Sequence, residues 1–363
     1  MRFLLLLFIL FFLGACQSNN KQINNIVTNR YANHFLIKAL QDSSYILKVI
    51  NPYQGSKNDT FTYYLSAYSK PNSIHIPIQR VVLFSTTYIG YFEALNELNA
   101  IKAISGTSMV YNSKLRNEIE QKHILEAGYE SNINFEQILS LRPDVVFIYS
   151  VGKENMPYVN KFLTLQIPVV YVAEFMEENP LGRVEWIKFF SVFFQKKQLA
   201  DSIFEQIESR YKTMKNNVHV NHQPTVFFNI PYQGVWYMPN GNSYFAQLTK
   251  DAGGNYIFCN QQSSAILKFD FEKVFSHAQN ADIWLNPGSC RSKKELLRAD
   301  KRYELFKAFK TNAIYNHTKR ITSQGGNDFW ESGVVNPHLI LEDLIHIFSN
   351  DSSFQYHYYQ RIS

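Results

Sequence analysis

The cysteine at position 16 lies three residues after the end of an apolar run from Phe3 to Leu13. A thiol at such a position can carry a covalently attached acyl group. The run is too short to span a bilayer, which needs about 20 apolar residues. A single charge, Arg2, precedes it. This length and these flanks are typical of a signal-peptide core, so we expect residues 1–15 to be removed.

The tetrapeptide Leu13-Gly14-Ala15-Cys16 resembles the lipobox of bacterial lipoproteins, where the cysteine becomes the first residue of the mature chain and carries acyl groups. Each buried CH₂ group contributes about 0.8 kcal/mol, so several acyl chains anchor a protein firmly. Residues 16–30 are polar and rich in Asn, as expected of a lipidated tether. The sequence therefore predicts a lipid-anchored protein of the cell envelope that faces the periplasm or the exterior.

Non-covalent binding chemistry is concentrated in a few loops. Aromatic residues make up 15% of the chain, and rings with a polar tip suit ligand clefts, although an aromatic-rich core accounts for part of this content. Open α/β sheets bind ligands at the carboxyl ends of their strands, so the candidates follow short apolar runs. They are Thr86, Thr87, Tyr88, Tyr232, Trp236, Tyr237, Asn242, Asn327 and Trp330.

Among these candidates, we expect Trp236 and Tyr237 to stack on the ligand. Tyr149 and Tyr244 occupy similar loops. Arg183 is placed to meet an anionic ligand, or it pairs with the nearby Glu185 along the start of a helix.

The sequence gives little support for a catalytic site or a metal site. Gly-x-Ser-x-Gly is absent, and no serine sits in a recognisable strand-to-helix elbow, which argues against an exported hydrolase. The ten histidines are scattered, and His219-x-x-His222 falls at a junction between segments. Cys259 and Cys290 either form a disulfide or remain two lone thiols. We therefore expect neither an enzyme, nor a metal site, nor a cofactor.

Length and charge narrow the class of protein further. The chain has 363 residues, which is too long for one ordinary compact core and suits two lobes. Its net charge of +6 is spread along the sequence without a run of five basic residues. Together with the predicted export, this distribution argues against nucleic acid as a partner.

The order of apolar runs indicates a mixed fold. Residues 31–79 alternate apolar and polar side chains, with a turn at 51–55, which predicts a small N-terminal β element. From residue 80, short buried strands alternate with helices, which indicates a parallel sheet in an N-lobe, 80–181. The same pattern resumes after residue 219, in a C-lobe that extends to residue 363.

A long apolar periodicity without proline connects these halves and predicts a helix over 182–218, although a break into two shorter helices is compatible with it. The predicted fold class is therefore α/β, with two Rossmann-like lobes joined by one long helix and a small N-terminal β element.

Four segments resemble the cluster A-II, or class III, solute-binding lipoproteins of ABC importers, which include vitamin B12-binding and ferric-siderophore-binding proteins. The resemblance covers about residues 80–350. It is carried by 80–87, by 134–146 with its Arg-Pro-Asp before a hydrophobic strand, by the long helix, and by 269–274. The N-terminal β element and the tract 325–333 resemble elaborations in lipoproteins of this family from Bacteroidetes.

The resemblance implies that the ligand sits between two lobes and that one carboxylate on each lobe meets an arginine of the permease. Glu136 and Glu272 match those two docking positions, each at the start of a helix. Taken alone, each is better explained as a solvated carboxylate that the helix dipole stabilises, and the docking role depends on the two similar placements, one in each lobe. The implied function is capture of a metal chelate, cobalamin or an iron-siderophore, and its delivery to the permease.

The choice of ligand stays open in the sequence. Catecholate siderophores are anionic and require several basic residues, whereas only Arg183 and Lys153 are obvious, so a corrinoid is slightly favoured. A haem-binding surface lipoprotein is the main alternative, because tyrosine can ligate haem iron.

Overall fold

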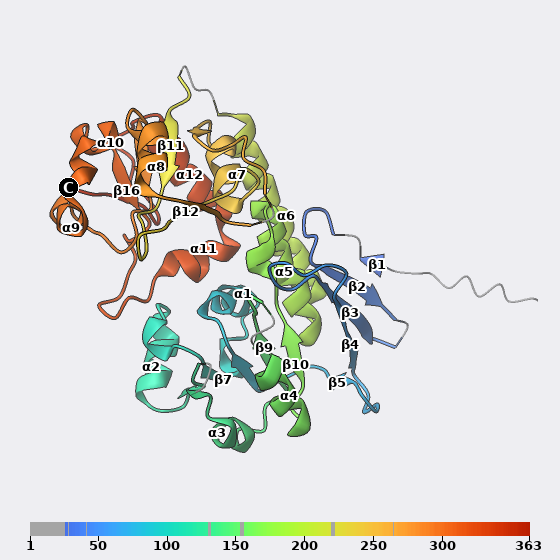
Figure 1. Ribbon diagram of the computed structural model, residues 1–363. Coiled ribbons are helices and arrows are strands. Elements are labelled where there is room, and N and C mark those ends of the chain that lie inside the picture. The colour runs from blue at the N-terminus through green and yellow to red at the C-terminus, as the bar shows by residue number, and fades with distance from the viewer. Residues whose placement is uncertain are drawn as a thin grey trace, which may run out of the picture.

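The computed structural model of the protein describes residues 26–27, 29–40, 42–129, 132–152, 156–218, 222–263 and 265–363. The predicted signal peptide and the lipidation site Cys16 lie outside these residues, as do Lys153, His219 and most of the predicted tether. Within the described part, no helix is long and apolar enough to cross a membrane. Figure 1 shows two lobes, with a small sheet beside them.

The small sheet is the N-terminal element. Its strands follow chain order, and all neighbours are antiparallel except the parallel pair β4 and β5. One side of the sheet packs on the N-lobe, so the two share a single hydrophobic core. The sheet begins with β1, inside the segment that the sequence assigned to the tether. The strands are β1 (Ile26–Val27), β2 (Phe35–Ala39), β3 (Tyr45–Ile50), β4 (Thr60–Ser66) and β5 (Ile74–His75).

The N-lobe contains a parallel sheet of five strands in the order β10-β9-β6-β7-β8. The chain order reverses between β6 and β9, which makes this the topological switch point where open α/β sheets bind ligands. The elements are β6 (Val81–Leu83), α1 (Ile89–Ala94), β7 (Ile101–Ile104), α2 (Ser113–Glu120), β8 (Leu125–Glu126), α3 (Phe135–Ser140), β9 (Val145–Ile148), α4 (Met156–Thr164) and β10 (Val169–Tyr171).

The C-lobe sheet has the order β13-β11-β15-β16-β17, parallel except for the last pair, with its switch point between β11 and β15. A two-stranded ribbon, β12 with β14, lies apart from it. The elements are β11 (Thr225–Phe228), β12 (Trp236–Met238), α7 (Tyr244–Asp251), β13 (Asn255–Tyr256), β14 (Leu267–Phe269), α8 (Phe271–Ala278), β15 (Ile283–Leu285), α9 (Lys293–Ala299), α10 (Lys307–Lys310), β16 (Ile314–Asn316), α11 (Ser332–Val335), α12 (Pro337–Phe348) and β17 (Gln360–Arg361). The two lobes with parallel sheets confirm the predicted α/β class.

The prediction of one long connecting helix is wrong. Two helices, α5 (Pro180–Phe193) and α6 (Lys197–Asn216), occupy the segment. Gln195 adopts a left-handed conformation with φ of 56°, which ends α5 and turns the chain back. The helices then lie side by side, with Lys188 Nζ 4.1 Å from the centre of the Phe204 ring (Figure 1). The chain passes from the N-lobe to the C-lobe through α6, whose 20 residues span about 30 Å.

Two buried carboxylates hold the start of the described chain against this helical hairpin. The Glu185 carboxylate accepts the backbone N–H groups of residues 30–32 at 2.8–3.0 Å, together with Lys188 Nζ at 2.8 Å. The Glu177 carboxylate accepts the N–H groups of Asn33 and His34 at 2.9–3.0 Å and the Trp186 indole N–H at 3.1 Å. Residues 30–34, which we call the N-terminal strap, are thereby fixed to α5.

A second bridge between the lobes is the C-lobe segment 320–335. The buried Glu331 carboxylate accepts the backbone N–H groups of Tyr111 and Asn112 in the N-lobe, the latter at 2.9 Å. The approach is close, because a Cβ atom at Gly90 would come within 2.3 Å of the Glu331 carbonyl oxygen. We call segment 320–335 the interlobe latch.

Candidate functional site

The two switch points lie in different lobes, and polar loops follow the strands at each of them. Ser85 to Thr87 follow β6, and Tyr149 follows β9. In the C-lobe, Asn229 follows β11 and Asn286 follows β15; both have positive φ values, of 62° and 55°. Asparagine tolerates this left-handed region better than most residues, so the sequence suits the sharp turns at these strand ends.

A cavity of about 500 Å³ lies between the lobes and has three walls. One wall is the N-terminal sheet, the second is the segment from the end of β10 into α5, and the third is the C-lobe. The lining residues are Asn33, His34, Asn51, Tyr53, Gln54, Gly55, Ser56 and Lys57 of the first wall, Phe175, Met176, Glu177, Glu178 and Arg183 of the second, and Asn229, Pro239, Asn240, Ser243, Tyr244, Phe245 and Ile266 of the third.

Arg183 crosses the cavity between the second and third walls. Its Nη2 donates to the Phe175 carbonyl oxygen at 3.0 Å, and its guanidinium carbon lies 4.0 Å from the centre of the Tyr244 ring. Such stacking on an aromatic face is a favourable cation–π contact. The fixed guanidinium has five N–H donors, of which these bonds use only a part, so Arg183 can also donate to a ligand.

A buried carboxyl group stands behind this arginine. Glu174 accepts the Thr87 hydroxyl at 2.7 Å through Oε1, whereas Oε2 has no hydrogen-bond partner among the described residues. Burial raises the pKa of Glu174, and the positive charge of Arg183 opposes that rise. The site therefore holds one fixed cation beside a carboxyl group that burial drives toward its neutral form.

Aromatic rings extend from the cavity into both lobes. The Phe175 ring meets that of Tyr149 at 6.2 Å, and the Tyr149 hydroxyl lies 3.3 Å from that of the half-exposed Tyr129. On the C-lobe side, Phe245 meets the edge of Trp330 at 6.1 Å. The cavity thus combines stacking surfaces with several amide and hydroxyl groups, as ligand pockets for mid-sized organic molecules do.

None of the nine predicted ligand residues is among the lining residues of this cavity in the described structure. Thr86 and Thr87 are half-buried, and the Thr87 hydroxyl donates a hydrogen bond to the carboxyl group of Glu174. The prediction for Tyr88 is wrong, because its ring is fully buried in the N-lobe core against Phe190. The helical turn that follows β6 directs this ring inward, and the hydroxyl groups of the two preceding threonines stay near the surface.

The prediction that Trp236 stacks on a ligand is also wrong. Its side chain has no exposed surface, and its indole N–H donates to the Phe228 carbonyl oxygen at 2.9 Å in the C-lobe core. Residues alternate between the two faces of a strand, so β12 buries Trp236 and Met238 and turns Tyr237 outward. Tyr237 faces Lys268 of the paired strand.

The remaining C-lobe candidates occupy the margins of the cleft. Tyr232 is 66% exposed and pairs with Val235 at the base of a tight turn, and Asn242 lines a neighbouring polar groove. Asn327 donates from its amide to the His317 carbonyl oxygen at 3.0 Å, which shapes the interlobe latch. Trp330 packs behind Phe245 and supports one wall of the cavity.

Sequence reasoning missed the N-terminal wall entirely. Residues 51–55 carried a turn signal, and only the contact of this turn with the distant loop after β9 makes it part of a site. The sequence did indicate Tyr244 and Arg183 as candidates for ligand contact, and both residues line the cavity. The alternative considered for Arg183, a pairing with Glu185, does not occur, because the Glu185 carboxylate binds the N-terminal strap and Lys188.

The two predicted docking carboxylates are exposed. Glu136 lies in the first turn of α3, which Asn134 caps, and Glu272 lies in the first turn of α8, which Asp270 caps. Glu272 pairs with Arg302 at 3.2 Å, and both side chains are largely exposed. The two helices belong to opposite lobes (Figure 1).

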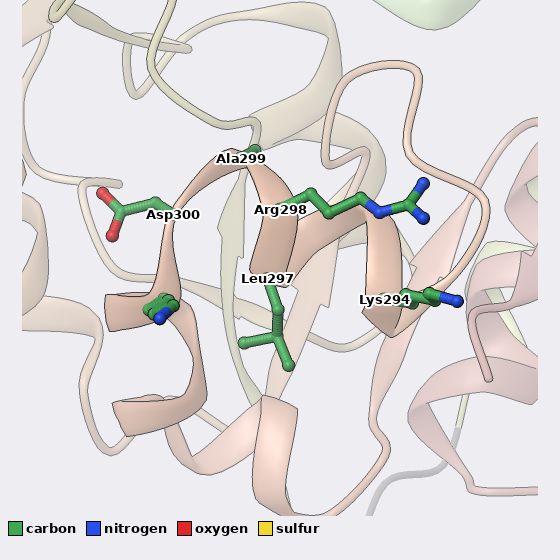
Figure 2. Close-up of a pocket in the computed structure, with 6 residues that line it drawn as sticks. Lys294, Leu297, Arg298, Ala299 and Asp300 are labelled. Atoms are coloured by element: carbon green, nitrogen blue, oxygen red, sulfur yellow. The ribbon is translucent and has the colours of Figure 1, made fainter.

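A separate hollow of about 710 Å³ lies on the outer surface of the C-lobe, where α9 ends. Figure 2 shows that Arg298 and Asp300 extend from its rim in opposite directions. Asp300 pairs with Arg302 at 2.8 Å. Because its polar groups diverge, this hollow lacks the convergent donors of a ligand site.

Metal ligands and a disulfide bond do not contribute to the site. No group of three His, Cys, Asp or Glu residues in the described part lies close enough to hold a metal ion. Cys259, which is exposed, and Cys290, which is buried, are both free thiols.

Comparison with known proteins places these features in context. Residues 81–321 match the family model described as periplasmic binding protein. An uncharacterized lipoprotein of Methanocaldococcus jannaschii is 29% identical over 278 residues, which are 75% of this chain and 65% of that protein, so the chain spans slightly less than two thirds of this relative. A second uncharacterized lipoprotein of that organism is 27% identical over 307 residues, 78% of this chain and 74% of the relative.

Solved structures share the fold at low identity. An ABC transporter substrate-binding protein from Listeria monocytogenes matches with a TM-score of 0.55 at 17% identity, over 75% of this chain and 99% of its own. A periplasmic heme binding protein from Pseudomonas aeruginosa matches with a TM-score of 0.59 at 14% identity, over 79% of this chain and 98% of its own. The periplasmic vitamin B12 binding protein of Vibrio cholerae matches with a TM-score of 0.51 at 11% identity, over 76% of this chain and 98% of its own.

Proposed function

Because the chain belongs to the periplasmic binding protein family, we propose that it is the solute receptor of an ABC importer. In this proposal it captures a metal chelate between its lobes and delivers the chelate to a membrane permease. The observation that carries the proposal is the cavity of about 500 Å³ between two switch points, lined by aromatic rings, amides and one fixed guanidinium.

The balance of charges in the lining favours a corrinoid over a catecholate siderophore. The lining contains one lysine and one arginine, Lys57 and Arg183, together with two glutamates, Glu177 and Glu178. A catecholate chelate carries several negative charges and calls for an excess of cations. A corrinoid instead presents a broad apolar plane bordered by amides, which suits rings such as Phe175 and Phe245 and the amides of the cavity.

Haem is the second candidate ligand. The observation that favours it is the pair Tyr129 and Tyr149, whose hydroxyl groups lie 3.3 Å apart next to Phe175. A tyrosine phenolate can serve as an axial ligand of haem iron. Two of the similar structures are also named as heme binding proteins.

We also propose the partner and the location. Glu136 and Glu272 dock the permease, since each offers an exposed carboxylate on a different lobe. Opposite charges at the rim of an interface guide association more than they hold the complex. An acylated Cys16 would keep the receptor next to that permease, and the two curated relatives named as lipoproteins support such an anchor.

The test is identification of the bound ligand. Protein purified under native conditions is analysed by mass spectrometry and then titrated with cyanocobalamin, a ferric catecholate siderophore and hemin. We expect a retained corrinoid and a dissociation constant for cyanocobalamin below about 1 µM, equivalent to about −8 kcal/mol.

Each other outcome has a distinct meaning. A Soret shift with hemin and no response to cyanocobalamin would establish haem as the ligand. Absence of binding to all three chelates, by a protein that unfolds cooperatively, would overturn the proposal of chelate capture. Hydrolysis of an ester or peptide substrate would instead support the hydrolase alternative.

A further inference from the structure

The N-terminal sheet contributes a large part of the cavity surface. Eight lining residues lie at positions 33–57, in the strap and in the loop between β3 and β4. This part of the chain precedes residue 81, where the match to the family model begins. The wall therefore lies outside the segment that the family model matches.

The loop between β3 and β4 has a defined conformation. The Asp59 carboxylate accepts the hydroxyl groups of Tyr53 and Ser56, both at 2.7 Å. The Asn51 side chain accepts the Asp59 N–H group at 3.2 Å. Gly55 has a φ of 75°, a conformation that glycine adopts without strain. A loop fixed in this way presents its remaining polar groups with little loss of entropy on binding.

The same loop is fastened to the ligand-binding edge of the N-lobe. The Gln54 N–H group donates to the Val151 carbonyl oxygen at 3.1 Å, in the loop that follows β9. The β9 strand flanks the N-lobe switch point. The backbone N–H group of Gln54 is therefore used in this contact, whereas its exposed side chain, like that of Lys57, is free to face the cavity that both residues line.

The polar groups of this wall have a common chemistry. Gln54 lies across the cavity from amide side chains of the C-lobe, at Asn229 and Asn240. A carboxamide offers two N–H donors and a carbonyl acceptor, and a lysine offers three donors. Amide groups of a ligand can pair with both the N–H donors and the carbonyl acceptors of this set, whereas carboxylates and catecholates only accept and leave the carbonyl oxygens of the carboxamides unpaired.

We propose that Gln54 and Lys57 determine specificity by binding the amide-bearing rim of the chelate, so that the N-terminal sheet forms a third wall of the ligand site. This inference rests on the proposed function. It restricts the ligand to chelates that carry peripheral amides, as corrinoids do.

The test compares Gln54→Ala, Lys57→Ala and the double variant with Lys48→Ala. Lys48 is a matched control, because it is exposed on β3 of the same sheet and is not among the lining residues. Melting temperatures should agree among all four variants, since each altered side chain is exposed. Each protein is titrated with cyanocobalamin, which has peripheral amides, and with hemin, which has none.

We expect the double variant to bind cyanocobalamin about tenfold more weakly than the wild type, because two hydrogen bonds are lost. Each single variant should show a smaller loss of affinity for cyanocobalamin. The control should bind normally. Equal cyanocobalamin affinity in the double variant and the wild type would overturn the inference and leave the proposed function intact. A wild-type protein that binds neither probe would remove the proposed function, and the inference with it.

Discussion

Burial divides the aromatic residues of segment 232–245 into two groups. Trp236 and Tyr244 are buried, while Tyr232 and Tyr237 keep exposed surface. Composition and turn signals predicted a loop that displays rings, but a strand of only three residues sends every second side chain into the core. A pattern this short is too weak in the sequence to predict which rings are buried.

At the residue scale, we predict that Trp236→Ala acts on stability. Its ring fills the C-lobe core, and removal of a buried tryptophan ring costs about 3–5 kcal/mol. Tyr237→Ala should cost far less, because that side chain is half-exposed on the same strand. Urea denaturation of both variants without ligand measures the difference. Equal stability losses in the two variants would show that Trp236 is not a core residue.

At the scale of elements, the hairpin of α5 and α6 shows which elements apolar periodicity can predict and which it cannot. The strands β6, β9, β10, β11 and β15 were predictable, because each is a short apolar run that is buried on both faces. The break at Gln195 was not, because no glycine or proline marks it and Phe193 and Phe194 continue the apolar pattern across it. Tertiary packing of α6 on α5 decides the turn.

The interlobe latch carries a pH prediction. The pKa of Glu331 is raised from its ordinary 4.5 to about 7, and burial is the largest cause. The N–H groups of Tyr111 and Asn112 oppose the rise, and the nearby carboxylates of Asp328 and Glu93 contribute to it. Between pH 4.5 and about 7 the folded chain therefore retains a proton that the unfolded chain releases, so the free energy of unfolding falls as the pH rises.

The measurement compares the wild type with Glu331→Gln, which does not titrate in this range. The stability advantage of the wild type over the variant should shrink between pH 5 and pH 8, by at most about 3 kcal/mol, since one pKa unit corresponds to about 1.4 kcal/mol. Because other titrating groups are common to both proteins, their effects largely cancel. A difference that stays constant with pH would show that Glu331 ionises normally.

At the scale of the whole molecule, the sequence predicted two lobes and a cleft, but not which residues line the cleft. Strand ends can be located from apolar runs, and this places Asn229 and Thr87 near a site. Which loops meet depends on contacts between distant segments, such as Gln54 with Val151. Such contacts leave no local signal, so the third wall was not predictable from one sequence.

We predict that Glu136→Ala and Glu272→Ala leave ligand affinity unchanged and that the double variant abolishes uptake. Loss of one partner from a desolvated interfacial charge pair costs about 2–5 kcal/mol, whereas a rim charge mainly affects the rate of association. Titration and uptake in cells carrying the cognate importer measure the two properties. Glu120→Ala on α2 is the control, because this carboxylate is exposed in the N-lobe outside the proposed docking positions. Weaker ligand binding with normal permease binding would place the two carboxylates in the cleft instead.

We predict that Cys16→Ser prevents anchoring. The variant should accumulate as an unprocessed precursor or as a protein released from the membrane, because serine cannot accept the acyl groups. Membrane fractionation and the mass of the amino-terminal peptide report both effects. Normal processing and normal membrane association of the variant would refute lipidation at this residue.

The N-terminal strap has a consequence for the order in which the molecule folds. Its partners Glu177 and Glu185 lie 143–155 positions later in the chain. Closing so long a loop costs entropy before any contact forms, and contacts of this kind slow folding. Although residues 30–34 are synthesised early, their hydrogen bonds to Glu177 and Glu185 can form only after those two residues have been made.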